Sequence, residues 1–169
     1  MHETSEDIAR LQALLDASHA AAGAHLRSIF ADERRVAAGD LPARLTGVQV
    51  THLATVTARG QPRVAPVDGL FFRAALYVGT APGAMRARHL RVRPQVSASI
   101  AHGEEFALVL HGRAVELDLD APENDGLRAY YTEVYGQAWE SFRQGNPYWR
   151  LEPERIFTFG GWAGISRRR

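Results

Sequence analysis

The chain has 169 residues, a hydrophobic content of 46% and a formal net charge of +1 at pH 7. This length is enough for one domain with a sizeable core, and we expect a single domain over residues 1–169. The small net charge argues against a nucleic-acid binder that acts through a bulk field. The absence of cysteine excludes disulfides, thiolate nucleophiles and cysteine-based metal sites. No apolar run is long enough to span a bilayer and the acidic N-terminus is not a signal peptide, so we expect a cytoplasmic protein.

Residues 1–45 are predicted to form a helical N-terminal extension. Thr4 and Asp7 have the spacing of a capping box, which predicts a helix start at this point. Apolar residues follow at helical spacing, namely Ile8, Leu11 and Leu15. Gly23 is expected to divide the segment into two helices. We expect these helices to pack on the core or on a partner subunit rather than to carry chemistry.

The pattern changes at Val48, where short β-rich runs and turn residues begin. Pro66 lies within one predicted strand and suggests an edge strand or a bulge, and Gly112 suggests a bend. A basic helix over Ala84–Arg93 is halted at Pro94, and further helices are expected after Asp120. Strands at close spacing with one inserted helix favour a barrel over residues 46–160 rather than alternating βαβ units. The predicted strands are Val48–Thr57, Arg63–Asp68, Gly69–Phe72, Leu76–Val78, Gln95–Ala101, Phe106–Leu117 and Ile156–Phe159.

The stretch Tyr77–Ser99 contains a strand end, a Gly/Pro turn, the basic helix and the next strand. The N–H groups at the helix start, the positive end of the helix dipole and nearby arginines would together favour a phosphate group. These arginines are Arg86, Arg88 and Arg91. A crossover helix with a solvated basic face is the alternative, and the local pattern alone favours that alternative.

The same stretch resembles the flavin-anchoring segment of the FMN-binding split β-barrel proteins, the pyridoxamine 5′-phosphate oxidase-like family. Members often have Gly-Thr, then Lys/Arg-x-x-Asn-Leu-x-x-x-Pro before a strand; this chain has Gly79-Thr80, Arg86, His89-Leu90 and Pro94. Gly60–Val67 resembles the family's Gly-x-Pro-x-x-x-Pro-Val strand. The resemblance covers about Thr51 to Leu117 and returns weakly at Arg150 to Phe159. It implies a mainly β fold with α, a split β-barrel with N-terminal and C-terminal flanking helices, and a homodimer with a cofactor groove at its interface.

The resemblance also implies which residues bind FMN. Arg86 would bind the phosphate together with Thr80, whereas His89 stands where relatives often have Asn. Arg63 could place positive charge near the ring or the phosphate, or could form a surface cross-strand pair. Trp149 is the implied aromatic cover from the partner subunit, although packing in a dimer core is the alternative. The implied set is Arg63, Val64, Ala65, Pro66, Val67, Val78, Gly79, Thr80, Met85, Arg86, His89, Leu90 and Trp149.

The implied function is that of a flavin-dependent oxidoreductase, which transfers hydride to or from a small organic substrate. The sequence contains no Gly-x-Ser-x-Gly, His-Glu-x-x-His, Walker or Gly-x-Gly-x-x-Gly motif, and no catalytic or metal-ligating residue is assigned. True pyridoxamine phosphate oxidase activity is disfavoured. Those enzymes carry a basic substrate-phosphate site and a C-terminal Arg-Leu segment that the end of this chain does not match.

Three alternatives remain open. The deazaflavin coenzyme F-420 could occupy the same groove, since its phosphate also needs basic residues. A non-enzymatic protein could hold flavin or haem, with His89 or His111 as a haem ligand. Nucleic-acid binding through Arg86–Arg93 and the Arg167–Arg169 tail is disfavoured, because aromatic residues are not interleaved with the basic run.

Overall fold

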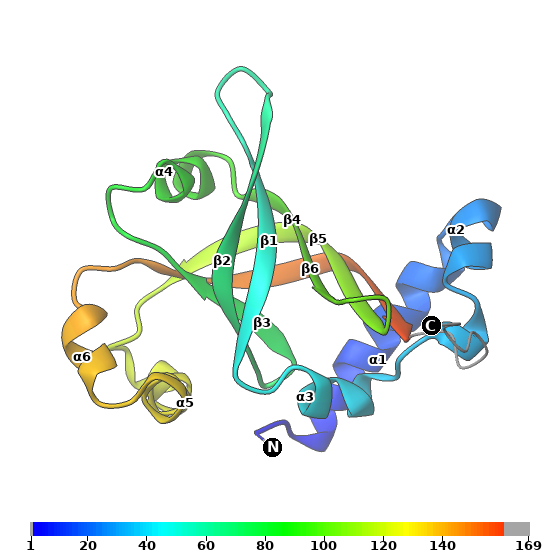
Figure 1. The fold of residues 1–169 in the computed structure, drawn as a ribbon, viewed down its shortest axis with the longest axis horizontal. Coiled ribbons are helices and arrows are strands. Elements are labelled where there is room, and N and C mark those ends of the chain that lie inside the picture. Colours follow the sequence, from blue (N-terminus) through cyan, green and yellow to red (C-terminus); the bar gives the residue numbers. More distant parts are fainter. Residues whose placement is uncertain (1, 161–169) are drawn as a thin grey trace, which may run out of the picture.

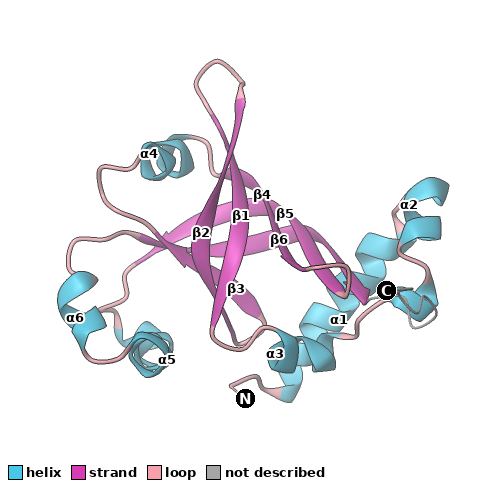
Figure 2. Ribbon diagram, in the orientation of Figure 1, coloured by secondary structure: helices cyan, strands magenta, loops and turns pink. Residues whose placement is uncertain are grey.

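In the computed structural model, which describes residues 2–160, six antiparallel strands form a closed barrel (Figures 1 and 2). The strand order is β1-β2-β3-β6-β5-β4, and pairing of β1 with β4 at His52–Ala54 closes it. The strands are β1 (Val48–Val56), β2 (Pro62–Phe72), β3 (Ala75–Gly79), β4 (Gln95–His102), β5 (Phe106–Leu117) and β6 (Tyr148–Gly160). The predicted barrel is therefore confirmed.

Helices flank the barrel on two sides (Figure 1). On one side α1 packs against β6, whereas α4, α5 and α6 lie on the opposite side of the barrel in this view. No helix among residues 2–160 combines the length and apolar character needed to cross a bilayer. The Arg167–Arg169 tail lies outside the described residues. The helices are α1 (Ser5–Ala20), α2 (Ala24–Ile29), α3 (Leu41–Arg44), α4 (Met85–Val92), α5 (Asp125–Tyr135) and α6 (Ala138–Phe142), with 3-10 turns η1 (Asp32–Arg34), η2 (Ala38–Asp40) and η3 (Pro122–Asn124).

Helix α1 begins with the predicted capping box. The Thr4 hydroxyl accepts a hydrogen bond from the Asp7 backbone N–H (3.1 Å), and the Asp7 carboxylate accepts one from the Thr4 N–H (3.0 Å). Both bonds satisfy backbone donors at a helix start, where no intrahelical acceptor is available. Gly23 is the N-cap of α2 and separates it from α1, as predicted.

We expect Thr4→Ala to lower the free energy of unfolding by about 1 kcal/mol, because the variant loses the hydroxyl acceptor. Ser5→Ala is the matched control, since Ser5 is exposed and occupies the first helical position instead of the cap. Urea unfolding of both variants measures the difference. Equal losses for the two substitutions would contradict a specific capping role.

Two predicted strand boundaries are wrong. Gly69–Phe72 is not a separate strand but the continuation of β2, which runs without interruption from Pro62. Strand β6 begins at Tyr148, eight residues before the predicted start at Ile156. The first half of β6 contains charged residues and Pro153, which hide its β character in the sequence. It is paired nonetheless, because Pro153 lies opposite Gly112, where the register of β5 and β6 shifts.

This register shift confirms the predicted bend at Gly112. A Cβ at this position would lie 2.0 Å from the carbonyl oxygen of Glu152 and 2.9 Å from Pro153 Cα. The two backbones can approach this closely only because Gly112 has no side chain.

Strand β2 is paired on both sides along only part of its length. It pairs with β1 over Val48–Val56, but with β3 only from Gly69 to Phe72. Its second edge from Pro62 to Asp68 therefore has no strand beside it, while the chain leaves β3 through Thr80 into α4. We call this region the fork: the first arm is Pro62–Asp68 and the second arm is Gly79–Arg86.

Pro66 is compatible with this edge. Arg86 donates a hydrogen bond to the Pro66 carbonyl (3.2 Å), so this carbonyl faces the fork and not β1. In an antiparallel pair the nitrogen and the carbonyl of one residue face the same side, so no ladder hydrogen bond is lost at the proline nitrogen. By the same alternation, Val64 presents its N–H and C=O to the fork. The sequence prediction of an edge position for Pro66 is confirmed.

Candidate functional site

Arg86 connects the two arms of the fork from the first turn of α4. Its Nη1 donates to the Thr80 hydroxyl (3.3 Å) and its Nη2 donates to the Pro66 carbonyl (3.2 Å). Both acceptors are neutral, and within the described residues no carboxylate lies within 4.0 Å of this guanidinium. Arg91 on the same helix differs, because it forms a two-pronged pair with Glu116.

Partial burial lowers the pKa of the Arg86 guanidinium from its ordinary value. The group nevertheless stays charged at neutral pH, because an arginine titrates far above that pH. A partly desolvated cation that touches only neutral oxygens gains most from an anionic partner. Arg86 therefore makes the fork a candidate site for an anionic group.

The start of α4 adds backbone donors to the same place. The N-cap residue Ala84 makes no side-chain hydrogen bond to the helix, so no side chain competes for the first-turn N–H groups. Arg86 lies in the first turn of α4, at the positive end of the helix dipole. Met85, which also belongs to the predicted set, is the first residue of the helix and is exposed.

His89 and Leu90 face the protein interior. His89 is buried, and its Nδ1 lies 2.9 Å from the hydroxyl of Thr55 on β1, which is also buried. Leu90 belongs to the barrel core. These two residues therefore attach α4 to the barrel and do not line the fork. Sequence reasoning missed Thr55, because nothing near it in the chain indicates a partner 34 residues away.

The strand segment Arg63–Val67 divides into two faces. Arg63, Ala65 and Val67 lie opposite buried residues of β1, whereas Val64 and Pro66 lie opposite its outward-facing residues and are exposed. The side chains of Ala65 and Val67 therefore flank the fork from the interior side. Val64 and Pro66 contribute their backbone edge to the fork, and their side chains belong to the outer surface of the barrel.

Arg63 points toward its own hairpin. Its guanidinium donates to the Pro62 carbonyl and to Gln61 Oε1, each at 3.1 Å. The predicted alternative of a cross-strand surface pair is therefore not what these contacts show. Arg63 and Arg86 lie on the first and second arm, respectively.

The second arm is supported by the beginning of β6. The Thr80 N–H donates to the Pro147 carbonyl (3.2 Å), and Gly79 pairs with Tyr148. A Cβ at Gly79 would lie 2.6 Å from the Tyr148 ring, so this close contact needs glycine. Val78 is buried in the barrel core directly before the arm begins.

Trp149 does not occupy the predicted position. Its side chain is 1% exposed and packs in the core of its own chain, which does not fit a role as a cover over a partner subunit's groove. Trp139 and Tyr148 are also buried. In the C-terminal third of the described residues, the aromatic side chain that remains most exposed is Phe142 on α6, at 73%.

Two open clefts lie along α4. One has a volume of about 320 Å³ and is lined by Pro82–Ala84 together with Arg88, Arg91 and Val92. The other, of about 580 Å³, is lined by Arg91, Glu116–Asp120 and Arg143–Tyr148. Neither of these two clefts is lined by Arg86, which is half-buried.

No protein-family model matches this sequence, and no curated protein matches it either. Solved structures do match. The haem storage protein HutZ from Vibrio cholerae is 24% identical with a TM-score of 0.62, over 72% of this chain and 95% of HutZ. An FAD-binding protein from Mesorhizobium loti is 26% identical with a TM-score of 0.59, over 74% of this chain and 93% of that protein.

A Listeria innocua protein provisionally assigned as a pyridoxamine 5′-phosphate oxidase is 19% identical with a TM-score of 0.56. It is matched over 70% of this chain and 94% of its own. The strands form a small, closed antiparallel barrel in which β2 and β3 pair only from Gly69 to Phe72 and then diverge. This is the split β-barrel fold of the pyridoxamine 5′-phosphate oxidase-like proteins, which confirms the resemblance seen in the sequence.

Proposed function

We propose that this chain binds FMN in the fork and acts as an oxidoreductase that exchanges hydride with a small organic substrate. The observation that carries the proposal is Arg86, a partly buried cation that connects both arms and has only neutral partners. The similarity to an FAD-binding protein supports a flavin as the ligand.

The residues of the fork fit such a cofactor. Arg86, Thr80 and the first-turn N–H groups of α4 would hold the phosphate. The Arg63–Val67 edge and Val78–Thr80 would support the ring, and the backbone N–H and C=O of Val64 could hydrogen bond to its polar edge. The bound flavin supplies a reversible hydride acceptor, so that the chain has only to bind it, orient it and limit access of water.

The visible spectrum of the purified protein is the first test. We expect flavin absorbance bands, and tight binding of FMN added to any cofactor-free fraction, measured by flavin fluorescence. If the protein is colourless and binds added deazaflavin coenzyme F-420 but not FMN, the cofactor is F-420 instead of FMN. Binding of neither would overturn the proposal.

Haem is the second candidate. It is favoured by the similarity to HutZ and by His111, which is exposed on β5 and whose Nδ1 lies 2.8 Å from Ser97 Oγ. This contact leaves Nε2 as the nitrogen available to a metal. His89 is less suitable, because it is buried against Thr55. A Soret band after haem addition that disappears in His111→Ala would support haem binding.

We also propose a homodimer that covers the outer face of the β1–β2 hairpin. Val50 on β1 is 59% exposed and Val64 on β2 is 68% exposed, and both side chains point to this face. Val48 continues the apolar row along β1. A second copy would bury these side chains and would also cover the outer side of the fork.

We expect Val64→Glu to convert a dimer into monomers, because each subunit would bury an unpaired carboxylate in the interface. Glu123→Gln is the control, because Glu123 is exposed and lies in η3, outside both strands of this face. Sedimentation velocity measures the mass of both variants. A Val64→Glu protein that stays dimeric would exclude this face as the interface.

A further inference from the structure

Asp68 lies at the base of the fork, where β2 and β3 separate. It is the last residue of the unpaired edge, directly before Gly69, which pairs with Val78. Two residues earlier, the Pro66 carbonyl accepts the hydrogen bond from Arg86, and two residues span about 7 Å along a strand. Asp68 pairs with Val50, so its side chain lies on the same outer face of the barrel as Val64 and Pro66. The fork thus has a cation along its edge, and a carboxylate lies on the outer face beside its base.

The only side-chain partner found for the Asp68 carboxylate in the described part of the chain is Tyr135 on α5. Tyr135 Oη donates to Asp68 Oδ2 at 3.2 Å. Among residues 2–160 no lysine, arginine or histidine lies within 4.0 Å of this carboxylate. Both residues are exposed, so the carboxylate can still accept further hydrogen bonds from a ligand.

Tyr135 is held in place by an aromatic stack. Its ring lies parallel to that of Tyr131 (6.1 Å between centroids, 11°), and Tyr131 stacks on Trp139 of α6 (4.9 Å, 7°). Partial burial, and then the negative charge of Asp68, raise the pKa of the Tyr135 phenol. The phenol therefore keeps its proton at neutral pH and remains a donor to the carboxylate, and the pair carries one negative charge.

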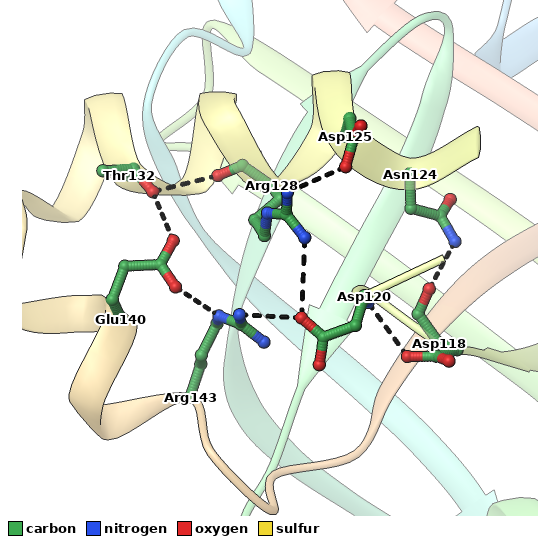
Figure 3. A network of polar contacts seen from close by, with 8 residues as sticks. All are labelled: Asp118, Asp120, Asn124, Asp125, Arg128, Thr132, Glu140 and Arg143. Atoms are coloured by element: carbon green, nitrogen blue, oxygen red, sulfur yellow. Dashed lines mark hydrogen bonds and ion pairs between the residues drawn. The ribbon is translucent and has the colours of Figure 1, made fainter. Parts of the chain in front are cut away.

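A network of ion pairs fixes the two helices that carry this stack (Figure 3). Arg143, the C-cap residue of α6, bonds to Glu140 (2.7 Å) and to Asp120 (2.8 Å), and Arg128 on α5 bonds to Asp120 and Asp125. Because Asp120 contacts arginines from both helices, it ties α5 to α6 beside the end of β5. The ion pairs between α5 and α6 thus hold the phenol of Tyr135 in its position beside Asp68.

We propose that Asp68 and Tyr135 recognise the substrate of this oxidoreductase and that they select a protonated amine. A carboxylate is the strongest acceptor for an ammonium group. The same charge disfavours a substrate phosphate. This inference rests on the proposed FMN site, because it places the amine on the outer face at the base of the fork that would hold the ring. Sequence reasoning missed the pair, since its members lie 67 residues apart and Tyr135 was counted only as part of an apolar helix face.

The test uses the FMN-loaded full chain and two probes of similar shape, benzylamine and phenyl phosphate, titrated at pH 7. Flavin absorbance changes and isothermal titration report binding independently of turnover. We expect benzylamine to bind and phenyl phosphate not to bind. Asp68→Asn should lower the affinity for benzylamine at least about tenfold, because this variant loses the negative charge. Tyr135→Phe should lower it several-fold, because it loses the hydroxyl that orients the carboxylate. Glu123→Gln, which removes an exposed carboxylate outside this pair, should change the binding of neither benzylamine nor phenyl phosphate.

The two proposals fail in different ways. If FMN does not bind to the unaltered chain, the proposed function fails before the amine is added, and the recognition proposal fails with it. If FMN binds but benzylamine does not, or binds equally to Asp68→Asn and to the unaltered chain, only the recognition proposal is overturned. Asp68→Lys gives a reciprocal readout, since it should admit phenyl phosphate and reject benzylamine. Should Asp68→Asn fail to fold, Tyr135→Phe and Asp68→Lys carry the test.

Discussion

Arg86→Ala is expected to weaken FMN binding by about 2 kcal/mol, or roughly 30-fold, because a charge-assisted phosphate contact is lost. Without cofactor, the melting temperature of the variant should equal that of the unaltered chain or be slightly higher. Arg86 is partly desolvated and has no anionic partner in the described part of the chain, so its removal relieves a cost of burial. Fluorescence titration with FMN and thermal unfolding of the cofactor-free protein measure the two effects separately.

Arg88→Ala is the matched control for this variant. Arg88 lies two residues further along α4 and is exposed, so it contributes to the general field of the helix but makes no contact with either arm that we observe. We expect Arg88→Ala to weaken FMN binding by less than about 0.5 kcal/mol. If both arginines lower FMN affinity equally, the helix attracts anions only as a basic surface and the assignment of Arg86 is refuted.

Gly112→Ala should destabilise the protein by more than about 3 kcal/mol, the largest effect we expect from a single added methyl group. The new Cβ would lie 2.0 Å from the Glu152 carbonyl oxygen and 2.9 Å from Glu154 N. Both obstacles are backbone atoms of β6, so relief requires the two longest strands to move apart. Urea unfolding monitored by circular dichroism gives the free energy of unfolding.

Gly39→Ala controls for the entropic effect of replacing any glycine. A Cβ at Gly39 would meet nothing within 4 Å, and its backbone does not need the left-handed conformation. This variant should be neutral or slightly stabilised. A Gly112→Ala protein as stable as the Gly39→Ala protein would show that β5 and β6 tolerate a side chain at the bulge.

The sequence was sufficient to predict the barrel and its special positions, because these depend on local chemistry. The capping box at Thr4, the edge position of Pro66 and the bend at Gly112 all follow from what these residue types permit in a backbone. Strand β6 was predicted too short because its first half is charged. Its strand character comes from pairing with β3 and β5, which is a tertiary effect.

The candidate site was less predictable, because side-chain direction depends on the fold. Arg86 was chosen by its position in a motif, and its contacts with both arms support that choice without testing the cofactor. His89 belongs to the same motif but faces the interior, and Trp149 is buried in the core of its own chain. Asp68 and Tyr135 come together only after β2 and α5 are placed side by side, so no local pattern could indicate them.

Arg86 has one further consequence for binding. A guanidinium has five N–H donors, and the contacts with Thr80 and Pro66 engage two of them, which leaves three for an incoming anion. The spacing between the two arms of the fork is therefore set before the ligand arrives. The two contacts of Arg86 do not have to break when an anion binds. Such preorganisation reduces the entropy lost on association, so that one arginine can hold a small dianion tightly without a lid.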